Sequence, residues 1–161
     1  MARFTPSMLD RLLDDTPGLR SDSAAAGVSL EQLKDSVVRD LEALLNARCG
    51  LRKGALEAHL HAQRSILNFG MVDFSSMSLA RTEDRLTICR AIEAAITAHE
   101  PRLKDVHVSL GGGDASSRLM FAIQAVLVVN PAREPVSFNA MLQPTTQLYC
   151  VSKATRLARA G

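Results

Sequence analysis

The sequence predicts an α+β fold, in which two amphipathic helices precede a four-stranded antiparallel meander and a short helical appendage lies at the N-terminus. In two segments before residue 100, apolar residues recur with a period of about 3.6, as on one face of a helix. From residue 106 onward they alternate with polar residues or form continuous runs, which is typical of strands. Glycine, proline and asparagine separate these runs and indicate the turns of a meander.

Length and composition favour one domain. The chain has 161 residues, of which 47% are hydrophobic and 22% are charged, as in ordinary globular proteins. We expect a helical appendage and linker at residues 1–28, a single α+β domain at 29–152 and a basic tail at 153–161. The net charge is only +2, which gives no general electrostatic case for binding nucleic acid or an anionic membrane. The positive charges of the tail are Lys153, Arg156 and Arg159.

The N-terminal appendage contains an amphipathic segment that is too short to form a stable helix alone. A Thr-Pro-Gly sequence at residues 16–18 ends this segment, and charged residues interrupt any core of a signal peptide. No apolar run reaches the roughly 18 residues that a membrane span needs. We therefore expect a cytoplasmic protein whose appendage becomes ordered mainly against a partner. The apolar stripe of the segment consists of Met8, Leu9, Leu12 and Leu13.

The first helix of the domain is expected to follow Ser29, which forms a capping-box pattern with Gln32. Cys49 and Gly50 are the expected stop. Residues 50–81 lack a clear period, which predicts a structured but irregular connection. The apolar stripe of this helix consists of Leu30, Leu33, Val37, Leu41, Leu44 and Leu45.

The second helix is expected from about Thr82, which is well placed to be its N-cap, to His99. One face of this helix is apolar, and the other carries arginines and glutamates. The predicted apolar face consists of Leu86, Cys89, Ile92 and Ile96.

Four strands are expected after the helices. Residues 106–110 alternate as in a half-buried strand, whereas residues 119–129 are apolar on both faces, which predicts a central strand covered on both sides. Alternation returns at residues 136–142, and a last run passes through Leu148 and Cys150. The first and last strands should form the edges of the sheet.

No cofactor or metal site is predicted. His59 and His61 would lie on different sides of a helix, and no cysteine or carboxylate stands at ligand spacing from them. The three glycines at residues 111–113 lack the lysine and the helix N-terminus of a phosphate-binding loop, so they indicate a hairpin tip. The cysteines are far apart, which favours reduced thiols and folding without metal or disulfide. They are Cys49, Cys89 and Cys150.

Catalysis is not predicted. A glycosidase needs two acids and a pocket that raises the pKa of one of them, and sugar sites commonly supply aromatic platforms. The chain has no Trp, one Tyr and five Phe, so such a platform is hard to build. No serine lies in the sequence context of a nucleophile elbow, and no cysteine has a histidine and an orienting group that the sequence places beside it.

Glu100, Pro101 and Arg102 form a charged tripeptide between the second helix and the first strand. Proline disfavours helix at the residue before it and fixes its own φ, which predicts a stiff corner. If the corner is extended, residues two apart share a face, so the carboxylate and the guanidinium come together. They could bond each other as a local ion pair, or they could bind opposite charges on a partner, in bidentate fashion for the guanidinium.

If this pair is accessible to solvent, its contribution to stability is under about 1 kcal/mol. Under that condition, we expect Glu100→Ala and Arg102→Ala to abolish assembly with a partner and to leave the isolated protein folded.

Five stretches are colinear and together cover nearly the whole chain: residues 8–17 (MLDRLLDDTP), 36–48 (SVVRDLEALLNAR), 65–73 (SILNFGMVD), 99–103 (HEPRL) and the strands that follow. In this order they resemble the TssE family of type VI secretion systems. One departure is His99, where the family more often carries an aromatic residue before its Glu-Pro-Arg motif. Some relatives are labelled lysozyme-like, a label that the residues here do not support.

The resemblance implies a non-catalytic structural subunit of the type VI secretion baseplate, related to wedge proteins of contractile phage tails. It implies docking on the TssF, TssG and TssK wedge, at the cytoplasmic face of the inner membrane, and initiation of the contractile TssB/TssC sheath. It also implies that Glu100, Pro101 and Arg102 bind the baseplate partner. Sheath subunits of this kind join through donated strands, for which an edge of the meander is a template, and the sequence leaves open which edge receives them.

Two other classes of function remain open at this point. A related fold occurs in anti-adaptor proteins, which would make the chain a regulatory binding protein. The enzymatic alternative is a peptidoglycan hydrolase, against which the missing export signal already argues.

Overall fold

The structure is a computed structural model that describes residues 4, 12, 27–51, 54–56, 58–74, 77–78, 80–111, 119–129, 132–143 and 145–154. Two long helices come first and four strands follow, which confirms the predicted α+β fold. Two 3-10 helices lie between the long helices. The elements are α2 (Leu30–Asn46), η2 (Ala62–Arg64), η3 (Ile66–Asn68), α3 (Thr82–His99), β1 (Leu103–Leu110), β2 (Leu119–Val129), β3 (Ala132–Gln143) and β4 (Leu148–Lys153).

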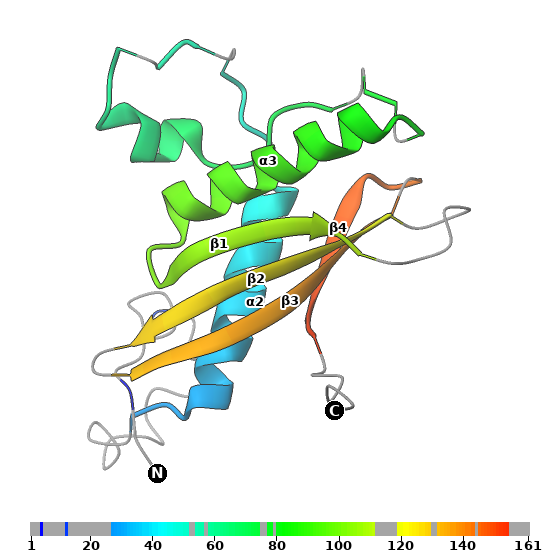
Figure 1. Ribbon diagram of the computed structural model, residues 1–161. Coiled ribbons are helices and arrows are strands. Elements are labelled where there is room, and N and C mark those ends of the chain that lie inside the picture. The colour runs from blue at the N-terminus through cyan, green and yellow to red at the C-terminus, as the bar shows by residue number, and fades with distance from the viewer. Residues whose placement is uncertain are drawn as a thin grey trace.

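The strands form one antiparallel sheet in the order β1-β2-β3-β4, so β1 and β4 are its edges, as predicted. In Figure 1, α3 lies along β1 while α2 crosses behind the sheet, and α2 also packs against β4. Alternate residues of the strands meet both helices in one apolar core. The largest fully buried side chains of this core are Phe121, Phe138, Leu41, Leu45, Met71, Ile88, Ile92, Ile96, Ile123, Leu127 and Val37.

One face of β2 packs on the core, so the expected cover on both sides was wrong. On the opposite face Gln124 is exposed and Val126 and Val128 are only half-buried. The physical reason is that α2 and α3 both contribute to the same core, and no helix of the described segments covers the second face. The residues of β2 that face the core are Phe121, Ile123, Ala125 and Leu127.

The capping box at the start of α2 is confirmed. The Ser29 hydroxyl accepts from the Gln32 backbone N–H at 3.2 Å, and the Gln32 side chain accepts from the Ser29 N–H at 2.8 Å. The predicted stop at Cys49-Gly50 is too late, because the helix ends at Asn46. Ala47 is already extended, and its carbonyl accepts from the Met71 N–H at 2.9 Å, so pairing with a distant segment ends the helix.

Helix α3 begins at Thr82, but Thr82 is not its N-cap. The cap position is Arg81, whose side chain makes no capping hydrogen bond, and Glu83 and Asp84 in the first turn supply negative charge there instead. Leu86 was also placed wrongly, since its side chain is 45% exposed. The buried face consists of Ile88, Cys89, Ile92 and Ile96.

Strand β1 contains an irregularity between Lys104 and His107, where Asp105 adopts a left-handed φ of 52°. Residues five apart in a regular strand would point to opposite faces, yet Leu103 and Val108 are both buried. The extra residue of a bulge therefore places both side chains on the core.

Most of the predicted appendage lies outside the described residues. Phe4 and Val28 form an antiparallel bridge with backbone hydrogen bonds of 3.0 and 2.8 Å, and the Leu12 side chain is 70% exposed. Beyond Gly111, the predicted hairpin tip also falls outside the described part of the chain, as do Arg156 and Arg159 of the basic tail. None of the described helices has the length and apolar character needed to cross a membrane.

Tyr149 is buried, and its hydroxyl oxygen has no hydrogen-bond partner among the described residues. Burial raises the pKa of this phenol to about 12. Because the folded state then holds the proton more tightly than the unfolded state, the stabilising contribution is complete below about pH 10 and is lost as the pH rises toward 12.

We expect Tyr149→Phe to raise the free energy of unfolding by up to about 1 kcal/mol at neutral pH, because it removes a buried group without a partner. The variant should also lose less stability than wild type between about pH 10 and 12. Urea denaturation at several pH values measures both effects. A lower free energy of unfolding for the variant than for wild type at pH 7 would contradict this prediction.

Candidate functional site

The Glu-Pro-Arg corner closes α3 and starts β1. The Glu100 N–H donates to the Ile96 carbonyl at 2.8 Å as the last helical bond, and Pro101 prevents the helix from continuing. The Leu103 N–H donates back to the Glu100 carbonyl at 3.1 Å, which turns the chain into the sheet. Leu103 is buried, so both ends of the corner are fixed to the core.

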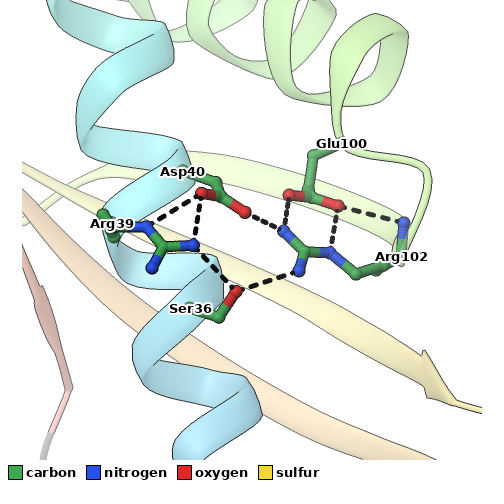
Figure 2. A network of polar contacts seen from close by, with 5 residues as sticks. All are labelled: Ser36, Arg39, Asp40, Glu100 and Arg102. Atoms are coloured by element: carbon green, nitrogen blue, oxygen red, sulfur yellow. Dashed lines mark hydrogen bonds and ion pairs between the residues drawn. The ribbon is translucent and has the colours of Figure 1, made fainter. Parts of the chain in front are cut away.

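Within the corner, Arg102 binds Glu100 in bidentate geometry (Figure 2). Nε donates to Oε1 at 2.7 Å and Nη2 donates to Oε2 at 2.5 Å. The Arg102 backbone N–H also donates to Oε1 at 3.2 Å. The Glu100 residue is only 5% exposed, whereas Pro101 is exposed. The sequence prediction that the two charged side chains share a face is therefore confirmed.

Helix α2 completes the site with three side chains (Figure 2). Arg102 Nη2 donates to Asp40 Oδ2 at 2.5 Å, and its Nη1 donates to the Ser36 hydroxyl at 3.3 Å. Arg39 contacts the other Asp40 oxygen at 3.2 Å and 3.3 Å. Two carboxylates and two guanidiniums thus join the corner to the middle of α2, and we call these five residues the corner network: Ser36, Arg39, Asp40, Glu100 and Arg102.

The electrostatics of the corner network favour a permanently charged Arg102. Hydrogen bonding to Glu100 raises the pKa of its guanidinium, and contacts with Asp40 add to this, while burial opposes both. The Arg102 side chain is 21% exposed and that of Glu100 is 6% exposed, so the pair is largely desolvated. The condition of an accessible pair therefore does not hold, so the expected contribution of under about 1 kcal/mol, which depended on that condition, does not apply to this pair.

His99 supports the corner from the side of the irregular connection. Its Nε2 donates to the Asn68 carbonyl at 3.0 Å, because a carbonyl oxygen can only accept. Its ring also meets the Phe69 ring edge-on, with centroids 5.4 Å apart and planes at 70°. Histidine thus retains an aromatic contact at the position where the TssE family more often has an aromatic residue.

Three of the stretches that carry the resemblance meet at this site. Residues 36–48 supply Ser36 and Asp40, residues 65–73 supply the segment under His99, and residues 99–103 supply the corner itself. Sequence reasoning missed Ser36 and Asp40. Their four-residue spacing places them on one side of α2, but nothing local in the sequence says what that side faces.

The edges of the sheet are bonded by the helices to different extents. On β4, the Asn46 amide donates to the Tyr149 carbonyl at 2.9 Å and accepts from its N–H at 2.8 Å, and Glu42 accepts from the Val151 N–H at 2.8 Å. On β1, Glu93 accepts from the Val108 N–H at 3.1 Å. Within the described strands, α2 therefore makes three such bonds to one edge and α3 makes one to the other.

The other candidates for chemistry in the described ranges are the two histidines and a groove. No group of three or more His, Cys, Asp or Glu side chains is placed there to hold a metal, and His59 and His61 are both exposed. A groove of about 360 Å³ lies between the start of α2 and the strands β3 and β4. Its Glu31 has a lowered pKa, through Lys34 first and then Lys153, which is the reverse of what a general acid needs.

Comparison with known families identifies the class of protein to which this chain belongs. Residues 31–132 match the family described as baseplate wedge protein gp25. No curated protein matches the chain. Because the match covers more than half of the sequence, the chain belongs to the baseplate wedge protein gp25 family. Membership supports a structural role in a phage-tail-like baseplate, together with other baseplate or tail proteins.

Proposed function

We propose that this chain is the TssE-type subunit of a type VI secretion baseplate. In this proposal it docks on a wedge of TssF, TssG and TssK in the cytoplasm, and it starts assembly of the contractile TssB/TssC sheath without catalysing a reaction. Glu100, Pro101 and Arg102 form the docking element.

The observation that carries this proposal is the construction of the corner network. Each oxygen of Glu100 accepts a hydrogen bond from Arg102, and Arg102 is also bonded to Asp40 of α2. The corner is thus held on two sides before any partner arrives, and a preorganised surface loses less entropy on binding. Pro101 is the exposed residue of the tripeptide, so Glu100 and Arg102 act mainly by fixing its position and that of the guanidinium edge.

For the sheath, we assign β1 as the edge that receives a donated strand. An incoming strand at β4 would have to displace three hydrogen bonds from α2, whereas at β1 it would displace one from Glu93. The Gly111 N–H bonds Met120 of β2, so by alternation the backbone groups of Leu110 point away from the sheet and can bond a fifth strand.

Leu110→Pro removes one of these outward N–H groups and leaves the β1–β2 ladder intact, so we expect it to block sheath assembly. Leu110→Ala keeps the N–H and is the control for lost packing. Lys153→Pro is the control for the other edge, because Ala154 bonds β3 and the Lys153 N–H therefore points outward as well. Fluorescent sheath formation in cells is the measurement. Normal sheaths with Leu110→Pro, or their loss with Lys153→Pro alone, would overturn the assignment to β1.

The function itself is tested by affinity purification of the tagged chain from its native cytoplasm, followed by mass spectrometry. The proposal expects wedge subunits TssF, TssG and TssK in the purified complex. A stable one-to-one complex with a response-regulator-type adaptor would instead make the chain an anti-adaptor. Clearing of a cell-wall suspension by the purified chain would make it a hydrolase, and either result would overturn the proposal.

A further inference from the structure

We propose that an aliphatic loop beside the corner, formed by Leu60, Ile66 and Leu67, is the apolar part of the surface that docks on the baseplate wedge. The occupant to which we commit is an apolar surface of a wedge subunit. This inference rests on the function proposed above and goes beyond the Glu-Pro-Arg corner.

The three side chains of the aliphatic loop are unusually open to solvent for their type. Leu60 is 75% exposed, Ile66 is 87% exposed and Leu67 is 60% exposed. A single exposed leucine needs no explanation, but three large aliphatic side chains exposed within eight residues are what a protein-binding segment needs. In Figure 1 the segment that carries η2 and η3 lies on the far side of α3 from β1, away from the sheet.

Hydrogen bonds from side chains brace the backbone of the loop. The Gln63 side chain donates to the Leu56 carbonyl at 3.0 Å, and the Asn68 side chain donates to the Gln63 carbonyl at 2.9 Å. The Ser65 hydroxyl donates to the Ala62 carbonyl at 2.7 Å. The polar side chains of the loop thus bond its backbone, while the aliphatic side chains are exposed to solvent. Because the backbone is already braced, less conformational entropy is lost on binding.

The aliphatic loop is continuous with the corner network. The Asn68 carbonyl accepts from His99, and the next residue, Phe69, packs its ring on the same histidine. His99 directly precedes Glu100, so its side chain connects the loop to the corner. An apolar area next to a charged, hydrogen-bonded corner has the composition of a protein interface with a dry core and a polar rim. This continuity favours the partner of the corner over a second copy of the chain as the occupant.

The test compares two double variants of the full chain for binding to a purified TssF/TssG/TssK complex. The first is Ile66→Ser with Leu67→Ser in the aliphatic loop. The second is Leu86→Ser with Leu148→Ser, which removes two aliphatic side chains, 45% and 51% exposed, outside the loop. We expect the loop variant to bind at least about tenfold more weakly than wild type and the control variant to bind like wild type. Because all four side chains are exposed, the thermal midpoints of both variants should stay close to that of wild type.

Binding of the loop variant with wild-type affinity would overturn the inference, as would an equal loss in the control variant. Light scattering on the free proteins provides a further readout. If the wild type forms dimers and the loop substitutions convert them to monomers, the aliphatic loop binds a second copy of the chain. That result would also overturn the inference. Failure of wild type to bind the wedge complex at all would instead count against the proposed function, so the two failures are distinguishable.

Discussion

Arg102→Ala is expected to lower the free energy of unfolding of the isolated protein by about 3 to 5 kcal/mol, because it leaves the buried Glu100 carboxylate without its counter-charge. Glu100 is 5% exposed and accepts three hydrogen bonds from Arg102, so water cannot readily replace them. Urea denaturation at neutral pH measures the change. The variant should also fail to support sheath assembly, since the corner loses its bond to α2.

Two controls separate this effect from the loss of an ordinary arginine. Arg90→Ala, at an exposed position of α3, should change stability by less than about 0.5 kcal/mol. Adding Glu100→Gln to Arg102→Ala should restore part of the lost stability, because the amide carries no charge to be left unpaired. A loss under about 1 kcal/mol for Arg102→Ala would show that the pair behaves as an exposed ion pair.

Gly70→Ala is expected to be the other strongly destabilising change, by about 3 kcal/mol or more. Gly70 has a φ of +106°, and a Cβ there would lie 2.7 Å from both the carbonyl carbon and oxygen of Ala47. The clash is with backbone, which cannot rotate away. It would push apart the bridge between Arg48 and Met71 and would disturb the segment under His99.

Gly50→Ala is the matched control, because a Cβ at Gly50 meets no atom within 4 Å. We expect it to be neutral or slightly stabilising, since alanine restricts the unfolded chain. Thermal unfolding of both variants measures the difference. A thermal midpoint for Gly70→Ala equal to that of Gly50→Ala would contradict the close approach of residues 69–71 to the end of α2.

Local patterns predicted much of the fold because they reflect local physics. The capping box of Ser29 and Gln32 and the alternation from Val136 to Leu142 each depend on neighbours within a few residues, and both are present. The end of α2 could not be read in this way, since it depends on a hydrogen bond between Ala47 and Met71. The open face of β2 was missed for a similar reason. An apolar strand favours burial on both sides, but the number of helices available for cover is a property of the whole chain.

In the candidate site, the contact within the tripeptide could be predicted from the sequence, whereas the contacts with α2 could not. Spacing and proline chemistry were enough to predict that Glu100 and Arg102 meet. Asp40 and Ser36 lie 62 and 66 positions from Arg102 in the sequence, so their place in the corner network follows only from the packing of α2 on the sheet. Burial of Glu100 has the same origin. Because Glu100 is buried, the pair that it forms with Arg102 is internal and not exposed to solvent. We therefore expect loss of this pair to lower both the free energy of unfolding and the affinity for a partner.

The most direct test of this account is a calorimetric titration of the purified TssF/TssG/TssK complex with wild type and with Arg102→Lys. Lysine retains the positive charge beside Glu100 but cannot form the fork that bonds Glu100 and Asp40 at once. At a temperature at which both proteins are folded by circular dichroism, wild type should bind and Arg102→Lys should bind at least about tenfold more weakly. Equal affinity of the two folded proteins for the wedge complex would contradict the claim that the geometry of this corner directs docking.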